Sequence, residues 1–346
     1  MDTVFISKLK FLFDPLEREM PLYVPRKEGS YYSFARYTPS GSAEYNQLRL
    51  CASAKEFLFP LREIAAVFPG ESETETEIKP FAVFGLKDCD LRAITILDKV
   101  FADEEFRDPS YVQRREKMFI ISSDCIEPAE SCCCSLFGGQ VYPRENYDLN
   151  VSKITDGFIV QAGSDKGRAF LRANEGLFAE VPHSALDERD GGRQAAQQEL
   201  EKNTREFQFD TPIRELVLNG RDSELFVQEV KGCVECQACT RICPTCHCFY
   251  LYDRKKEDYY DKMKIWDSCV RTDFTTVAGG ENPRDRLADR ARHRLLHKFV
   301  YFLDRYGIQM CVGCGRCVDA CAGETDIRQV LKKLSEEQDS KRKAKR

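Results

Sequence analysis

The sequence predicts an α/β domain over residues 1–220, a cysteine-rich domain over residues 221–332 and a charged tail over residues 333–346. Two observations lead to this division. Short apolar runs alternate with helical patterns in the first part of the chain, which is typical of a parallel α/β sheet. Eleven of the 17 cysteines lie between positions 233 and 321, which is typical of a metal-binding or redox domain. A chain of 346 residues has room for two such domains.

The α/β elements follow one another along the chain. Residues 81–86 (FAVFGL) form a short apolar run bounded by polar residues, which predicts a buried strand. Asp90 stands at the N-cap position of a helix over residues 91–101, and a second strand follows at residues 118–122 (MFIIS). A strand, a helix and a strand in this order predict a parallel pair. The remaining elements expected in this domain are a strand at 158–162 and a polar surface helix or linker at 185–208.

Two copies of the pattern C-x2-C-x2-C-x3-C carry the strongest signal in the cysteine-rich domain. The first copy begins at Cys233 and the second at Cys311. Three cysteines two residues apart let a tight loop wrap three corners of an iron-sulfur cubane, and Gly313 and Gly315 suit a close approach of the backbone. Zinc sites also use C-x2-C pairs, but seldom three evenly spaced thiols with a fourth after three residues. The pattern therefore favours 4Fe-4S clusters over zinc.

The two motifs are expected to exchange their fourth cysteines. In two-cluster ferredoxins the last cysteine of each run serves the cluster of the other run, so that the crossing ligands lock the two halves together. This rule predicts two 4Fe-4S clusters with two ligand sets. The first set is Cys233, Cys236, Cys239 and Cys321, and the second is Cys311, Cys314, Cys317 and Cys243.

Cysteines of the α/β domain are expected to converge on a third site. Cys89 follows the first predicted strand and Cys125 the second, so a parallel pair brings both to the carboxyl edge of the sheet. Cys132, Cys133 and Cys134 come soon after. The thiols of Cys89, Cys125, Cys132 and Cys134 are therefore the candidate ligands of a third iron-sulfur cluster, with free or redox-active thiols as the alternative.

Three more cysteines lie between the two motifs, at Cys246, Cys248 and Cys269. Three thiols do not complete a cubane, so His247, Asp267 or another thiol would have to supply a fourth ligand. The alternative is that they are buried thiols packed under the ferredoxin loops. All three remain candidate metal ligands.

The charge and apolar content exclude other classes of protein. Lys and Arg number 52 against 57 Asp and Glu, and this near balance argues against a protein built to hold nucleic acid. No apolar run approaches the roughly 18 residues that span a bilayer. The first 20 residues carry charges where a signal peptide needs an apolar segment. We therefore expect a cytoplasmic protein with no membrane span and no nucleic-acid partner.

The region between the two motifs resembles a known type of ferredoxin domain. Residues 244–310 are too many for the compact bacterial ferredoxin and are rich in helix formers, notably at 284–302. In this they resemble the alpha-helical ferredoxin domains of respiratory iron-sulfur subunits, which implies an alpha-helical C-terminal domain. Ala322 replaces the proline that usually follows the last cysteine, a departure that affects the local turn more than the ligation.

Several segments together resemble one protein family. They are KDCDLRAITILDKVF, YVQRRE, the DC and CCC pair, CxxCxxCxxxCPTCHC, WDSC and CVGCGRC. Over residues 80–330 they are similar to the beta subunit of soluble sulfhydrogenases and to the 4Fe-4S electron-transfer subunit of the anaerobic sulfite reductase, with related relays in flavin oxidoreductase and heterodisulfide reductase complexes. The family typically has C-x-C at residues 132–134, so the resemblance leaves Cys133 as a spare or a substitute ligand.

The resemblance implies an electron-transfer subunit without a catalytic residue of its own. Such a subunit connects a flavin partner that oxidises NAD(P)H to a catalytic reductase or hydrogenase partner. The residues agree, because no G-x-G-x-x-G follows a predicted strand and no P-loop is present, so we expect no flavin or NAD on this chain. The alternative is a disulfide or sulfur-compound reductase whose reactive centre is formed by residues 132–134 or by Cys246 and Cys248.

Overall fold

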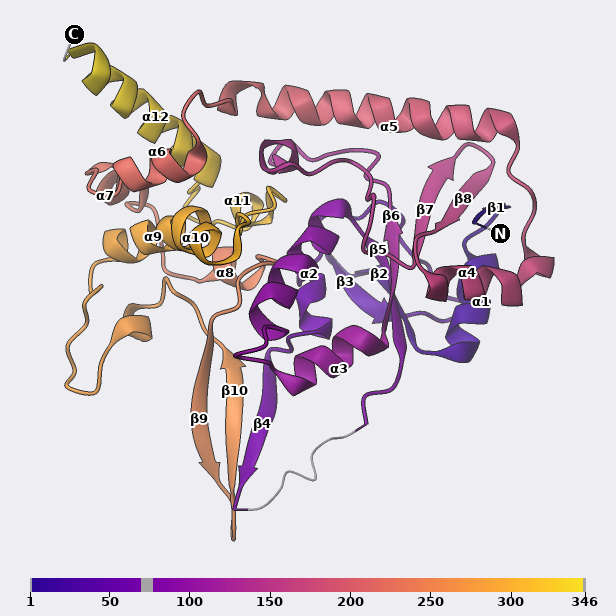
Figure 1. The fold of residues 1–346 in the computed structure, drawn as a ribbon, viewed down its shortest axis with the longest axis horizontal. Coiled ribbons are helices and arrows are strands. Elements are labelled where there is room, and N and C mark those ends of the chain that lie inside the picture. Colours follow the sequence, from indigo (N-terminus) through magenta and orange to yellow (C-terminus); the bar gives the residue numbers. More distant parts are fainter. Residues whose placement is uncertain (1, 70–76, 345–346) are drawn as a thin grey trace.

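A computed structural model describes residues 2–69 and 77–344. Its larger sheet has seven strands in the order β1-β8-β7-β6-β5-β2-β3 (Figure 1). The strand pairs β2·β5, β5·β6 and β6·β7 are parallel, whereas the outer pairs are antiparallel. The strands are β1 (Thr3–Ile6), β2 (Leu22–Glu28), β3 (Tyr31–Arg36), β5 (Phe81–Leu86), β6 (Met118–Ser123), β7 (Leu149–Ile154) and β8 (Gly157–Ala162).

Helices cover both faces of this sheet because its central strands are apolar on both sides. Neighbouring side chains of β5 enter different cores: Val83 packs in the core that α2 and α3 cover, and Phe84 in the core that α1 and α4 cover. Full burial on both faces explains why β5 and β6 are continuous apolar runs. The helices are α1 (Lys10–Glu19), α2 (Asp88–Phe101), α3 (Pro109–Lys117) and α4 (Asp165–Ala173).

The predicted strand-helix-strand unit is confirmed, with one correction at the start of its helix. β5 and β6 are parallel neighbours, and α2 lies between them in the sequence. Asp90 is not the N-cap, because α2 already begins at Asp88 and Lys87 is the residue before it. The Asp90 carboxylate instead accepts a hydrogen bond from the Lys87 N–H at 3.1 Å, which caps the helix from within its first turn. The strand expected at 158–162 is β8, and it is antiparallel to both of its neighbours.

A long helix, α5 (His183–Thr204), runs from the sheet to the cysteine-rich part of the chain (Figure 1). There α6, α9 and α12 pack on one another around a single core. Phe137, which follows the CCC run, stacks on Phe299 of this core with ring centroids 5.8 Å apart. The helical elements of this part are α6 (Ile213–Asn219), α7 (Leu225–Glu229), α8 (Ala238–Arg241), α9 (Leu287–Leu296), the π turn η6 (His297–Tyr301), α10 (Phe302–Tyr306), α11 (Arg316–Asp319) and α12 (Ile327–Ala344).

The cysteine-rich part is not all helical, which corrects the expectation of an alpha-helical domain. Strands β9 (Phe249–Lys255) and β10 (Tyr260–Trp266) form a hairpin between the two motifs. Strand β4 (Arg62–Phe68), from the N-terminal part, pairs with β10 and completes a second sheet that projects from the body (Figure 1). β-branched and aromatic residues in β9 and β10 favour strands over helix. The sheet order β4-β10-β9 therefore ties the two parts of the chain together.

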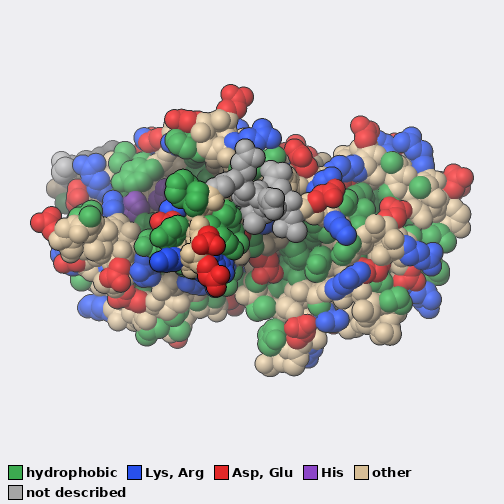
Figure 2. Space-filling view, turned by 90° about the horizontal axis from the view of Figure 1, so that it is seen from below, with side chains coloured by type: hydrophobic (Ala, Val, Ile, Leu, Met, Phe, Trp, Pro, Cys, Tyr) green, Lys and Arg blue, Asp and Glu red, His purple; other side chains and the backbone are tan. Residues whose placement is uncertain are grey.

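The projecting sheet carries exposed apolar side chains. Phe68 is 72% exposed, Tyr250 52% and Leu251 45%. Figure 2 shows the molecule from the side of this sheet, where apolar side chains lie among lysines, arginines and acidic residues.

At the other end of the molecule, α12 continues the chain as a helix as far as Ala344, so the segment expected as a charged tail is helical over its described residues. The Gln338 amide donates to the Leu216 carbonyl oxygen at 2.8 Å and holds α12 against α6.

Candidate metal centres

The loops of the two cysteine motifs have the same backbone shape. In the first loop Glu235 and Gln237 have left-handed φ angles of 53° and 63°, and in the second Gly313 and Gly315, at the equivalent positions, have φ angles of 65° and 72°. Two left-handed residues curl each loop around a centre, and a short helix, α8 or α11, then follows. The repeat in the sequence is therefore also a repeat in the structure.

The first hollow lies beside the first loop. Burial raises the pKa of Cys239 to about 11, whereas Cys236 is exposed, so this hollow lies close to the protein surface. The Thr325 N–H donates to the Cys321 sulfur at 3.2 Å. The cysteines lining the first hollow are the complete first predicted ligand set, Cys233, Cys236, Cys239 and Cys321, together with Cys317 from the second motif.

The second hollow lies beside the second loop and is more deeply buried. Burial raises the pKa of Cys311 to about 11 and that of Cys314 to about 12. The backbone N–H of Gly313 acts in the opposite direction at Cys311, because an N–H that points at a sulfur favours the thiolate. The cysteines lining this hollow are the second predicted set, Cys243, Cys311, Cys314 and Cys317, together with Cys133.

Close packing explains why the second loop uses glycine. A Cβ atom on Gly313 would lie 2.4 Å from the Cys133 carbonyl oxygen, and one on Gly315 would lie 2.5 Å from the Ser131 carbonyl oxygen. The Cys133 N–H also donates to the Gly313 carbonyl oxygen at 2.8 Å. The CCC run therefore lies directly on the second loop, whereas the first loop has room for side chains at both positions.

The third hollow lies at the carboxyl ends of β5 and β6, as the sequence predicts. The two strands are parallel, so the residues that follow them meet at one edge of the sheet. Of the CCC run, the first and third cysteines line this hollow and the middle one lines the second hollow. The cysteines of the third hollow are Cys89, Cys125, Cys132 and Cys134 from the α/β part, with Cys314 from the second motif.

Buried cations surround the third hollow. Lys87 is 2% exposed, and its ammonium group donates to the Ser123 hydroxyl at 2.8 Å and to two backbone carbonyl oxygens. Arg49 donates to the Cys132 sulfur at 3.5 Å. Burial raises the pKa of Cys125 to about 11, while the positive charge of Lys87 acts in the opposite direction. The cations therefore favour thiolates in a place where burial alone would oppose them.

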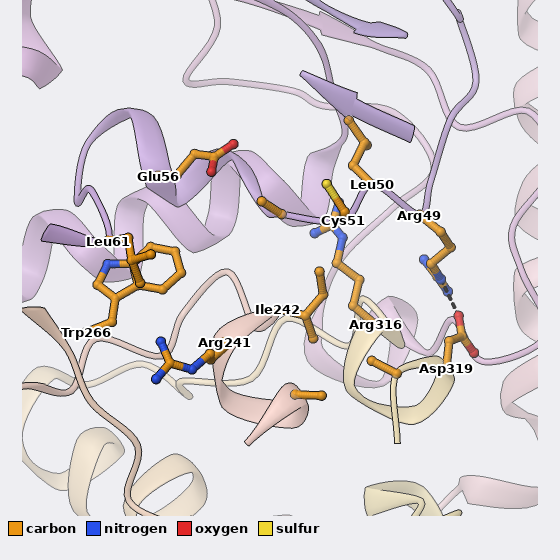
Figure 3. Close-up of a pocket in the computed structure, with 13 residues that line it drawn as sticks. Arg49, Leu50, Cys51, Glu56, Leu61, Arg241, Ile242, Trp266, Arg316 and Asp319 are labelled. Atoms are coloured by element: carbon orange, nitrogen blue, oxygen red, sulfur yellow. Dashed lines mark hydrogen bonds and ion pairs between the residues drawn. The ribbon is translucent and has the colours of Figure 1, made fainter. Parts of the chain in front are cut away.

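Residues 49–61, which precede both cysteine motifs in the sequence, pack against the loops of these motifs. Figure 3 shows the groove that this segment forms with α8 and α11, with Arg49 pointing at Asp319 and forming an ion pair with it. Cys51, which is exposed, lies on the same groove. Lys55 is 3% exposed and fastens the segment to the first motif. Its ammonium group donates to the carbonyl oxygens of Thr240, Cys243 and Cys246 at 3.3, 2.9 and 3.0 Å.

Of the cysteines between the motifs, Cys246 packs with Cys243, Val312 and Cys314 of the second hollow. Cys269 lies beside Cys248. The two residues considered as a fourth ligand have other partners. Asp267 forms an ion pair with Arg271 at 2.9 Å, and a ring nitrogen of His247 lies 3.0 Å from the Thr245 carbonyl oxygen.

The arrangement of the thiols fits polynuclear clusters better than single metal ions. All 17 cysteines are free thiols. Within residues 2–69 and 77–344, no three Cys, His, Asp or Glu side chains come close enough together to hold one metal ion. Three hollows lined by at least four thiols each are instead what a cubane with four cysteine corners needs.

Comparisons with known proteins agree with this geometry. A family model described as a 4Fe-4S dicluster domain matches residues 232–325, which contain both motifs. Sulfhydrogenase 2 subunit beta of Pyrococcus furiosus is 30% identical over 331 residues, which cover 94% of this chain and 95% of that protein. The chain belongs to the sulfhydrogenase beta-subunit family. As a member of it, the protein is an iron-sulfur electron-transfer subunit of an oxidoreductase complex.

Membership of the beta-subunit family fixes the broad organisation of the chain. It has a mixed α/β N-terminal region and a C-terminal 4Fe-4S dicluster domain. A beta subunit is one part of a complex, so the family assignment implies that this protein has partner subunits. In the part of this protein that the structure describes, no helix is both long and apolar enough to cross a membrane.

Sequence reasoning missed the buried cations of this beta subunit. Arg316 and Lys87 line the third hollow, Lys298 lines the second, and Arg294 lines the first and the second. A signal was present for part of this set. Arg290, Arg294 and Lys298 recur every four residues in a segment that the sequence predicts to be helical, so they lie on one face. On that face they replace the apolar residues that a buried helix usually carries.

Proposed function

We propose that this chain relays single electrons between a partner that oxidises NAD(P)H through a flavin and a catalytic reductase or hydrogenase partner. A 4Fe-4S cluster supplies the chemistry, because it takes up and releases one electron at a time. The chain would hold one cluster in each hollow, through the first, second and third ligand sets predicted from the sequence. Flavin and nicotinamide would then be bound by the partner, and the 17 free thiols support a reducing compartment such as the cytoplasm.

The observation that carries this proposal is that the three hollows lie in series. Cys314 lines both the third and the second hollow. Cys317 and Arg294 line both the second and the first. Neighbouring sites with shared walls are suited to passing electrons from one to the next. The first hollow lies close to the surface at Cys236, where a partner can approach.

Burial argues against the alternative, a sulfur-compound reductase with its own reactive cysteine. A substrate sulfur must reach the thiolate that attacks it. Cys132 is 8% exposed, Cys133 2% and Cys246 7%, so the folded chain shields these thiols. The other two thiols of this alternative, Cys134 and Cys248, are half-buried. The exposed apolar side chains on the projecting sheet favour a subunit that works within a complex, because such patches mark interaction surfaces.

Iron and acid-labile sulfide per chain, measured after anaerobic purification, test the proposal. We expect about 12 iron atoms per chain, since three cubanes contain four each. Cys132→Ser should lower the content to about 8 and remove one component of the EPR spectrum of the reduced protein. Cys51→Ser is the matched control, because Cys51 is exposed and belongs to none of the three ligand sets, and it should leave both readouts unchanged.

The possible results separate the alternatives. About 8 iron atoms in the unchanged protein would contradict the third site and leave its thiols free. Zinc in place of iron would contradict all three ligand sets. Reduction of a disulfide or sulfur compound by the isolated chain, with an artificial electron donor, would favour the reductase.

A further inference from the structure

Two buried cations lie against the first and second hollows and have no carboxylate partner within residues 2–69 and 77–344. Arg294 is 9% exposed and Lys298 2% exposed. Arg294 donates to the Cys239 carbonyl oxygen at 3.4 Å, and its Nε atom has no hydrogen-bond partner among the described residues. Lys298 donates to the Cys243 sulfur at 3.4 Å and to the Thr245 hydroxyl at 3.1 Å. Arg290, one turn earlier, does pair with a carboxylate, that of Glu235 at 2.8 Å.

A buried charge without a counter-charge is costly, so these two cations need a source of negative charge nearby. The Lys298 ammonium group contacts the Cys243 sulfur, and both cations line hollows that contain four or more cysteines. Glu229, which also lines the first hollow, pairs instead with Lys333. A cluster held by cysteine thiolates would supply the negative charge that the two cations need.

The helix places the two cations along the line of the two hollows. Four residues apart, Arg294 and Lys298 lie on one face. Lys298 falls in the π turn His297–Tyr301, a distortion of the kind that often accompanies functional sites. Its carbonyl oxygen accepts the Met310 N–H at 3.0 Å, next to Cys311, while its side chain reaches Cys243. Lys298 thus contacts Cys243 of the first motif and Met310, the residue before the second motif, and Arg294 lies on the wall that the first two hollows share.

We propose that Arg294 and Lys298 are positioning residues that raise the reduction potentials of the clusters in the first and second hollows. Reduction adds one negative charge to a buried site. A fixed cation in contact with that site stabilises the reduced form more than the oxidised form, so it raises the potential. Lys298 acts on the second site through Cys243, and Arg294 acts on both sites. The inference rests on the ligand sets given under the proposed function.

Redox titration followed by EPR tests the role of the charges. The neutral variants Lys298→Met and Arg294→Gln are compared with the charge-retaining variants Lys298→Arg and Arg294→Lys at measured iron content. In each neutral variant we expect the reduction equilibrium of at least one cluster to fall about tenfold, which is 59 mV for a one-electron couple. The charge-retaining variants should keep most of the original potential. Lys341→Met, which removes a cation that is 66% exposed in its side chain, should change nothing.

Equal potentials in the neutral and charge-retaining variants, at full iron content, would overturn the inference. Equal loss of iron in both kinds of variant would also overturn it, because shape rather than charge would then matter. Loss of iron in the neutral variants alone would support it. Failure of the proposed function would give a different result. The Cys243→Ser variant would then keep the full iron content of the unchanged protein, regardless of the reduction potentials measured in the Lys298 and Arg294 variants.

Discussion

The ion pair between Arg316 and Asp90 joins the two cysteine-bearing parts of the chain. Its two hydrogen bonds measure 2.6 and 3.1 Å, and the two side chains are 5% and 6% exposed. Asp90 follows Cys89 of the third ligand set, and Arg316 precedes Cys317 of the second motif. This buried contact, together with the packing of the CCC run on the second loop, therefore holds the third hollow against the second.

Asp90→Asn should destabilise the protein strongly although it barely changes the shape of the side chain. Removing one partner of a buried ion pair costs about 3–5 kcal/mol, because the other charge stays buried without compensation. The sulfurs of the third hollow partly compensate Arg316, so we expect the lower end, about 3 kcal/mol. On the usual scale of about 2–4 °C per kcal/mol this lowers the unfolding temperature by about 6–12 °C.

Thermal unfolding of the anaerobically purified protein, followed by circular dichroism, measures this effect. Asp165→Asn is the matched control, because Asp165 pairs with Arg168 in an ion pair whose carboxylate side chain is 98% exposed. Exposed pairs contribute little, so this variant should unfold like the unchanged protein. If Asp90→Asn also unfolded at the original temperature, the argument that this contact joins the two parts would be refuted.

Three further experiments test other parts of the structure. Gly313→Ala and Gly307→Ala both place a side chain at a left-handed φ, but only Gly313 also faces the Cys133 carbonyl oxygen, so only Gly313→Ala should lower the iron content. Lys55→Met leaves three carbonyl oxygens without their donor and should cost about 3 kcal/mol in a urea unfolding experiment. Burial lowers the pKa of His293 to about 4 and that of His297 to about 3, so the unfolded chain takes up protons first and the free energy of unfolding should fall between about pH 6.5 and 3. Replacing both histidines by Gln should reduce this fall, measured by the urea midpoint at each pH, and the remaining fall should come partly from His247, whose pKa burial lowers to about 4.

Local patterns predicted the parts of the structure that depend on neighbours in the sequence. The apolar run at Phe81–Leu86 and the helical spacing after Asp90 gave β5 and α2, because burial on a strand or a helix leaves a short period in the sequence. The cysteine spacing in the two motifs gave the matching loops for the same reason. The N-cap was wrongly placed at Asp90 because the helix begins two residues earlier, at Asp88. The contact of the Asp90 carboxylate with Arg316, more than two hundred residues away, leaves no local pattern in the sequence.

Long-range contacts could not be predicted in this way. The pairing of β4 with β10 joins segments nearly two hundred residues apart, and the sequence of neither strand indicates which strand it pairs with. The cations Arg294 and Lys298 look like the polar face of a surface helix until the thiols that they contact are in place. A charged residue is usually exposed, and only the three-dimensional arrangement reveals which ones are buried.

The CCC run shows how one short segment can separate two sites. Cys132 and Cys134 line the third hollow, while Cys133 lines the second and its backbone lies on Gly313. The middle residue therefore serves the structure through its N–H and carbonyl groups, which any residue possesses. In the ligand sets proposed above, the two outer thiols belong to the third site, so the C-x-C that the family resemblance implies at this place would be sufficient for it. In this chain the middle residue is a thiol as well, and it lies beside the four cysteines proposed for the second site.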